Sequence, residues 1–129
     1  MPLVNPGGGI TANWSTWVPT LTPLGSMTYT SQVINYAKYV TIGQILHFSV
    51  DFEGVVGGVP SSGVVFSLPV AGVDTSGMVV NGYVSDGGLL TVAFGNALTT
   101  SSFGVYKYTT AALTAGTVRF TVAGFYEIP

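Results

Sequence analysis

The strongest constraint on the fold is the segment ILHFSVDFE at residues 45–53, in which apolar and polar side chains alternate. One face of an extended chain would carry Leu46, Phe48, Val50 and Phe52. The other face would carry His47, Ser49, Asp51 and Glu53. Alternation with a period of two is typical of a β-strand that has one face on a core and the other in a wetter environment. The segment therefore predicts a strand in a sheet with one buried face.

Similar segments recur along the chain, with turn signals between them. They cover residues 27–31, 35–42, 64–68, 78–85, 89–94, 102–109 and 117–128. Gly43-Gln44 and Asp86-Gly87-Gly88 are hairpin turn signals, and residues 54–63 are rich in turn formers. We expect Gly95-Asn96 to end a strand and Gly124 to mark a bulge. About eight strands without a helical period predict an all-β fold, an antiparallel β-sandwich of the jelly-roll type.

The first 13 residues differ from the rest, and we expect them to form an extended N-terminal arm before a single domain at residues 14–129. Two prolines and the run Gly7-Gly8-Gly9 disfavour both a strand and a helix there. The segment is either a frayed end or an arm that lies along a neighbouring molecule. Two tryptophans follow, and large aromatic side chains usually anchor cores and interfaces. The candidate arm and partner contacts are Leu3, Val4, Ile10, Trp14 and Trp17.

The chain carries very little charge, with three basic and five acidic residues among 129. Ordinary domains contain roughly 25% charged residues, and a surface with so few charges is poorly protected against association. We expect part of the surface to be covered by partner subunits. The scattered basic residues give no footprint for nucleic acid. We find no signal peptide, no apolar run long enough for a membrane helix and no cysteine.

The sequence indicates no catalytic, cofactor or metal site. His47 is the only histidine, and Asp51 lies about 13 Å further along the same strand face, too far for a hydrogen bond. Asp51 and Glu53 stand about 7 Å apart, a spacing that a glycosidase or a calcium site could use. With so few acidic residues in the chain, a solvated pair is the simpler interpretation. No glycine run is followed by the residues of a phosphate loop.

Much of the chain after the arm resembles a pattern found in bacteriophage structural proteins. The pattern has a tryptophan before Pro-Thr-x-Thr, then Thr-Tyr-x-x-Gln, an aromatic residue, Ile-Gly before an alternating strand, and a later Leu-Pro. The matching residues are Trp17, Pro19, Thr20, Thr22, Thr28, Tyr29, Gln32, Tyr39, Ile42, Gly43, Leu68 and Pro69. The closing segment ALTAGTVRFTVAGFYEI is also similar to the last strand of that group. A glycine common before the second aromatic is replaced around Val33-Ile34-Asn35, which leaves the geometry of that hairpin open.

This resemblance implies a trimeric jelly-roll module on the outer surface of a virion, made in the host cytoplasm. We expect a non-enzymatic homotrimer that decorates the capsid by binding the major capsid protein or another virion protein. A first alternative is a tail-fibre or receptor-binding tip that contacts host glycan. A second is a glycan-cleaving enzyme that uses Asp51 and Glu53. The residues that we expect on an oligomer or glycan face are Tyr29, Tyr36, Tyr39, His47 and Asp51.

Overall fold

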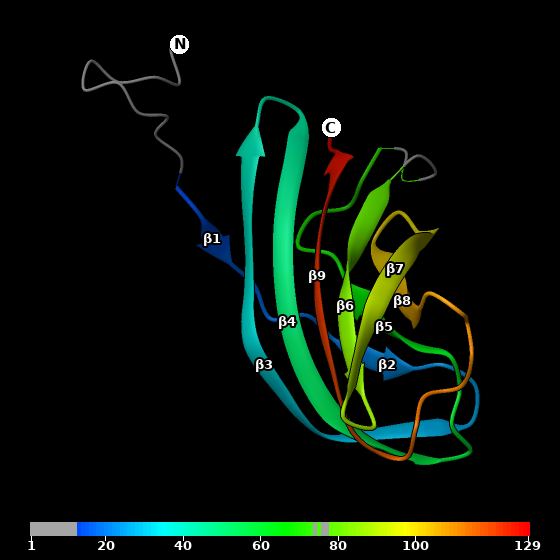
Figure 1. Cartoon of the computed structure of the whole chain (residues 1–129). Coiled ribbons are helices and arrows are strands. Elements are labelled where there is room, and N and C mark those ends of the chain that lie inside the picture. Colours follow the sequence, from blue (N-terminus) through cyan, green and yellow to red (C-terminus); the bar gives the residue numbers. More distant parts are fainter. Residues whose placement is uncertain (1–12, 74, 76–77) are drawn as a thin grey trace.

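A computed structural model of the chain describes residues 13–73, 75 and 78–129. The described residues form nine strands and no helix (Figure 1). The strands are β1 (Ser15–Thr16), β2 (Leu21–Pro23), β3 (Met27–Ile42), β4 (Ile45–Gly58), β5 (Gly63–Ser67), β6 (Val79–Asp86), β7 (Leu89–Thr99), β8 (Ser102–Lys107) and β9 (Gly116–Glu127). The predicted arm contacts Leu3, Val4 and Ile10 lie outside these ranges. None of the described segments is a helix long and apolar enough to cross a membrane.

All nine strands belong to one antiparallel sheet with the order β1-β3-β4-β9-β6-β7-β8-β5-β2. The sheet curls, so that β5 and β2 at one end lie across from β3 and β4 near the other (Figure 1). Strands β6, β7 and β8 form a meander, and β9 returns beside β6, which is a Greek-key arrangement. The prediction of an antiparallel, jelly-roll-like β-sandwich is therefore confirmed.

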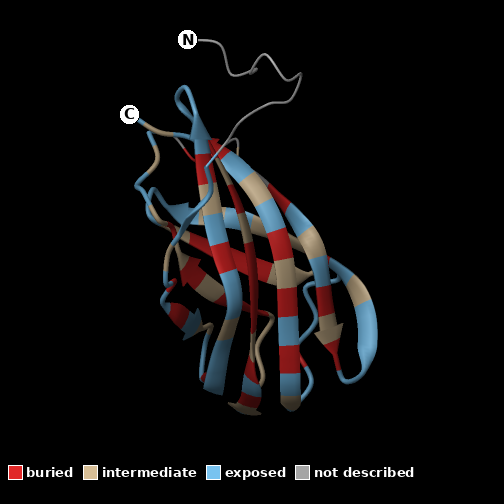
Figure 2. Cartoon of the chain, turned by 90° about the vertical axis from the view of Figure 1, so that its left-hand side faces the viewer, coloured by how far each residue is buried: buried red, intermediate tan, exposed pale blue. Residues whose placement is uncertain are grey.

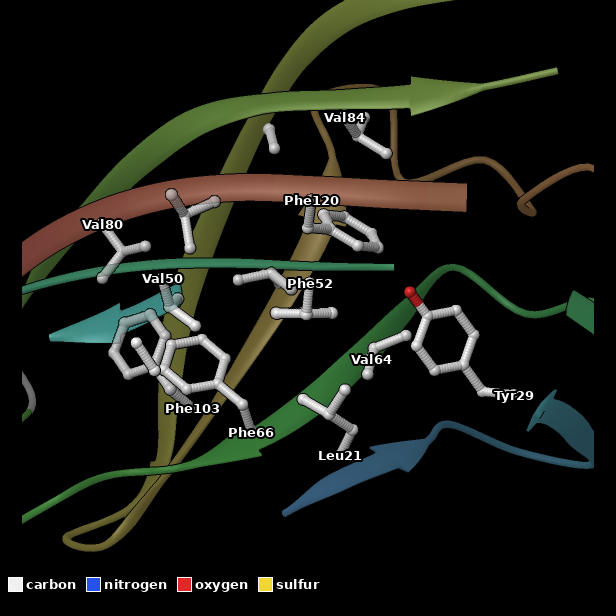
Figure 3. Close-up of a cluster of buried hydrophobic side chains, with 14 of the residues drawn as sticks. Leu21, Tyr29, Val50, Phe52, Val64, Phe66, Val80, Val84, Phe103 and Phe120 are labelled. Carbon is white, nitrogen blue, oxygen red and sulfur yellow. The ribbon is translucent and has the colours of Figure 1, made fainter. Parts of the chain in front are cut away.

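The core fills the space between the two layers of the curled sheet. Strands β4 and β5 are not hydrogen-bonded neighbours, yet Phe66 of β5 lies 5.8 Å from Phe48 and 6.2 Å from Phe52, both on β4. The close-up shows Phe52, Phe66, Phe103 and Phe120 converging from both layers (Figure 3). Each phenylalanine contributes roughly 1.5–3 kcal/mol when it is fully buried, so this cluster is the main source of stability.

The alternation that predicted β4 is real and extends beyond the predicted range. Leu46, Phe48, Val50 and Phe52 are all buried, and Figure 2 shows buried and exposed residues alternating along the strands of this layer. The two hairpin turns are also confirmed. Gly43 has a φ of +62°, and Gly87 and Gly88 have φ values of +60° and +81°, which glycine adopts without strain.

The prediction that residues 54–63 form a turn-rich connection is wrong for the first five of them. Strand β4 continues to Gly58, and Gly54 pairs with Val118 of β9. A Cβ atom on Gly54 would stand 2.7 Å from Cζ of Tyr29. The missing side chain lets the Tyr29 ring cross β4 and donate a hydrogen bond to the carbonyl oxygen of Val118 at 2.8 Å. Gly54 is therefore a packing residue, not a turn residue.

Residues 27–42 form one bent strand, where the sequence predicted two. Its register with β4 shifts between Thr30 and Val33 and again between Ile34 and Tyr36. Ser31 has a φ of 51°, an uncommon value for a residue with a side chain. The side-chain amide of Gln32 stabilises the first bend by donating to the carbonyl oxygens of Leu21 and Tyr29.

Two further glycine predictions are corrected. Gly95 does not end its strand, because β7 runs on to Thr99. A Cβ atom there would lie 2.5 Å from the ring of Phe103, so the glycine makes room for that ring. Gly124 marks no bulge, because β9 pairs with β4 in one unbroken register. Val122 and Tyr126, on either side of Gly124, both remain buried.

Candidate functional site

The outer face of β3, β4, β9 and β6 carries the polar residues that the sequence singled out, and Asp51 lies at its centre. The expectation that Asp51 is solvated is wrong, because only 2% of the residue is exposed. Oδ1 accepts hydrogen bonds from Arg119 Nε and Asn35 Nδ2, both at 2.8 Å. Oδ2 accepts from Arg119 Nη2 at 2.7 Å and from Thr121 Oγ1 at 2.8 Å.

These bonds set the charge state of the Asp51 carboxylate. Burial would raise its pKa, but the hydrogen bonds from Arg119, Asn35 and Thr121 outweigh burial and hold the pKa below its usual value. Both oxygens already accept bonds, so this carboxylate is a poor proton acceptor for a substrate. Glu53 is partly buried on the same strand. Among the residues that the structure describes, no group of three histidine, aspartate or glutamate side chains could hold a metal ion.

A second buried acid, Asp86, lies at the end of β6. Its Oδ2 atom forms an ion pair with Lys107 Nζ at 2.7 Å, and its Oδ1 atom accepts a hydrogen bond from the backbone of Thr114 at 2.8 Å. Burial opposes the charge, but the bonds from Lys107 and Thr114 lower the pKa of this carboxyl group. Asp86 thus fastens the loop before β9 to the β6–β7 hairpin, as expected for an aspartate that supports the backbone at a turn.

His47 lies in an open groove on the same outer face, near the start of β4. The groove has a volume of about 400 Å³. It is lined by Trp14, His47, Phe48, Ser49, Asn81, Ala123, Gly124 and Phe125. The His47 and Phe125 rings lie 5.8 Å apart, and Trp14 and Phe125 are 50% and 45% exposed. We call this feature the Trp14–Phe125 groove.

A lysine lies beside the Trp14–Phe125 groove, against the ring of Trp14. Lys38 on β3 pairs across the sheet with Ser49, and its ammonium lies 5.4 Å from the ring centres of both Trp14 and Tyr36. The ion pairs found within the described part of the chain join Lys107 to Asp86 and Arg119 to Asp51. Lys38 therefore has aromatic rings but no carboxylate partner among the described residues.

A separate apolar surface runs over the outer side of β6, β7 and the end of β8. Tyr83 pairs directly with Val92, and Phe94 stacks on Tyr106 with 5.5 Å between ring centres. Leu90 and Val92 are 69% and 60% exposed, although the sequence placed them together on one apolar face. We call this surface the β6–β8 strip, and it comprises Tyr83, Leu90, Val92, Phe94, Tyr106 and Tyr108.

The structure brings only some residues of the predicted oligomer or glycan face together on one surface. Tyr29 does not belong to it, because it is 4% exposed in the core and its hydroxyl bonds to Val118. Tyr39 packs against the core, with its ring 6.0 Å from that of Trp17. Tyr36 and His47 do lie on the outer face, and Asp51 is buried beneath it.

The two tryptophans have different environments. Trp17 donates from Nε1 to the carbonyl oxygen of Ser67 at 3.0 Å and packs edge-on against Phe48, so it is a structural anchor. Trp14 is half exposed in the groove. Sequence reasoning missed Arg119, Phe125, Asn81 and Lys38 as parts of the outer face. The signal that could have found them is cross-strand pairing. Lys38 on β3 and Arg119 and Phe125 on β9 lie on the two neighbours of β4, and Asn81 lies on β6, the next strand of the sheet.

Comparisons with protein-family models, with curated proteins and with solved structures found no match for this chain.

Proposed function

We propose that this chain is a non-enzymatic structural protein of a phage virion, a homotrimer that decorates the outer capsid by binding the major capsid protein or another virion protein. The resemblance to phage structural proteins supports the virion location. The observation that carries the proposal is the β6–β8 strip, a row of apolar side chains that the protomer leaves exposed.

The strip has the apolar character expected for the centre of a protein–protein interface. Fully burying a large apolar side chain contributes roughly 1.5–3 kcal/mol, so covering these partly exposed side chains would yield on the order of 5 kcal/mol. A standard interface buries about 800 Å² on each partner, and its energy comes mainly from a few aromatic or aliphatic anchors. Tyr83 and Tyr108 are of the residue type that most often anchors an interface, and Leu90 and Val92 add exposed apolar area beside them.

Charge does not protect the strip from association. Four of the eight charged residues are used in the two ion pairs that involve Asp51 and Asp86. The strip itself contains no charged residue. Sheets that must stay apart usually carry lysine or another charge on such a surface, so its absence favours self-association. A closed symmetric oligomer would remove the strip from water without leaving an open surface.

The oligomeric state tests the first half of the proposal. We expect light scattering of the full chain at micromolar concentration to give the mass of a trimer. Leu90→Glu, which places a charge in the middle of the strip, should convert the trimer to monomers. Val18→Glu is the matched control, because Val18 is 85% exposed but lies in the link between β1 and β2. A wild-type monomer at every concentration would overturn the proposal.

Binding to capsids tests the second half. Capsids stripped of surface proteins should take up the wild-type chain at a saturable number of sites in a sedimentation assay. If the chain forms trimers that do not bind to such capsids, the self-association is real but the decorating role is refuted.

A second candidate function is a receptor-binding tip, and the Trp14–Phe125 groove favours it. Exposed aromatic rings beside polar side chains are suited to holding a sugar. If this is correct, the pure protein should inhibit phage adsorption to host cells, which a capsid-decorating protein would not do.

A further inference from the structure

The Trp14–Phe125 groove combines features that point to a particular class of ligand. Two exposed rings stand on either side of β4, since Trp14 precedes the edge strand β1 and Phe125 belongs to β9. Three strand spacings separate β1 from β9, which gives roughly 14 Å between the backbones of these two strands. A groove of about 400 Å³ falls within the range of small-ligand sites.

Polar side chains lie between these rings and just beyond Phe125. His47 and Ser49 come from the outward face of β4, and Asn81 comes from β6 on the far side of β9. An imidazole, a hydroxyl and a side-chain amide can each donate and accept hydrogen bonds. The Ser49 hydroxyl is 3.4 Å from that of Tyr36, so it has capacity for a further partner. Such a floor is suited to a ligand with many hydroxyl groups.

The charge at one wall narrows the class of ligand. The Lys38 ammonium is held over Trp14 and has no carboxylate partner among the described residues. Glu127 follows Phe125 by two residues on β9 and is exposed, so a negative charge lies near the Phe125 side of the groove and a positive one near the Trp14 side. A ligand with a carboxylate would therefore be oriented with its acid toward Trp14 and Lys38.

From these observations we infer that the groove binds an acidic saccharide, a sugar ring that bears a carboxylate. One ring of the saccharide stacks on Trp14 or Phe125, hydroxyls along the saccharide bond to Asn81, Ser49 and His47, and one carboxylate pairs with Lys38. This inference goes beyond the capsid-decorating function and stands whether or not the chain forms trimers.

The test is a titration of the full chain with a trimer of galacturonic acid, beside the neutral galactose trimer of the same linkage. We expect saturable chemical-shift changes with both sugars and about 3- to 5-fold tighter binding of the acidic one, a difference that one exposed ion pair can supply. Trp14→Ala should weaken binding of both sugars by about 10-fold.

Lys38→Met keeps the apolar stem of the side chain and removes the charge, so it should abolish the preference for the acidic sugar while leaving the neutral sugar unaffected. Val59→Ala changes an exposed apolar residue in the loop between β4 and β5, outside both the groove and the β6–β8 strip, and should change neither affinity. Absence of saturable binding to both sugars would overturn the inference. Equal affinities for the two sugars, or a preference that survives in Lys38→Met, would overturn the acidic class.

Discussion

Arg119 on β9 reaches diagonally across the sheet to Asp51 on β4, although Glu53 is its direct cross-strand neighbour. The two guanidinium nitrogens meet the two carboxylate oxygens at 2.8 and 2.7 Å. Because Arg119 is half exposed and Asp51 is buried, the arginine covers the acid and connects it to solvent. This bidentate ion pair, which we call the Arg119–Asp51 fork, helps to fix the register between β4 and β9, two strands that are far apart in the sequence.

The stability of the protein should fall at acid pH because of Asp51 and Asp86. Both have a folded-state pKa below the usual value, so at low pH the unfolded chain binds protons that the folded chain does not. Their contribution to the free energy of unfolding is complete above the pKa of about 3.9 that an aspartate has in the unfolded chain. It is lost as the pH falls through the lower pKa of each group in the folded protein. Melting temperatures should therefore be flat down to about pH 5 and fall below about pH 4.

Asp51→Asn should reduce this acid sensitivity and also lower stability near neutral pH. The amide replaces one acceptor with a donor that faces Arg119 or Thr121, at a cost of about 1–3 kcal/mol. Urea unfolding at pH 7 and at pH 3 measures both effects. Equal pH dependence in the variant and the wild type would show that the fork contributes nothing to acid unfolding.

Gly54→Ala should destabilise the sandwich by about 1–3 kcal/mol, because the new methyl group overlaps the Tyr29 ring. The displaced ring would also lose its hydrogen bond to Val118. The same substitution in a Tyr29→Ala background should cost much less, since no ring remains to be displaced. A double-mutant cycle by urea unfolding gives the coupling directly, and additive effects would contradict this account.

Alkaline pH should destabilise the fold through its buried tyrosines. Burial raises the pKa of Tyr126 to about 12, and burial also raises that of Tyr29. The unfolded chain loses these protons near pH 10, so the stabilising contribution is complete below about pH 10 and disappears as the pH rises toward the folded values. In Tyr126→Phe the decline between pH 10 and pH 12 should be shallower than in the wild type. An unchanged decline would mean that Tyr126 ionises as readily in the folded protein.

Deleting residues 1–12 tests the predicted arm. The nine strands all lie after these residues, so we expect an unchanged melting temperature. Occupancy on stripped capsids should fall, because Leu3, Val4 and Ile10 are the apolar residues proposed to contact the shell. Full occupancy by the shortened chain would remove the arm from the proposed interaction.

Local patterns in the sequence predicted most of the strands. Two kinds of local signal predicted the structure correctly, because each depends only on residues close together in the sequence. They are the alternation at residues 45–53 and the turn glycines at 43, 87 and 88. Glycines inside strands were misread. Gly54 and Gly95 lie in segments whose composition is typical of turns. In the structure, however, Gly54 makes room for the ring of Tyr29 and Gly95 makes room for the ring of Phe103.

The candidate site depended on contacts that no local pattern encodes. Arg119 is 68 residues from Asp51, and their meeting follows from the position of β9 beside β4. Alternation placed Leu90 and Val92 on one face of β7 but could not say that this face points outward. The rule that the apolar face of a strand is buried fails for β7. An exposed apolar face of this kind often marks a surface that binds another protein or a ligand.

Strands β1 and β2 are consecutive in the chain but form opposite ends of the sheet. The short link between them is held to β5 by three bonds, from Trp17 Nε1 to the Ser67 carbonyl, from the Ser67 amide to the Thr20 carbonyl and from the Thr20 amide to Ser67 Oγ. A force applied through the N-terminus would therefore first load the pairing of β1 with β3 in one layer and then the bonds of the link to β5 in the other, before it reached β2. In the proposed role on a capsid, a pull from the N-terminal side would have to break contacts in both layers to free this part of the chain.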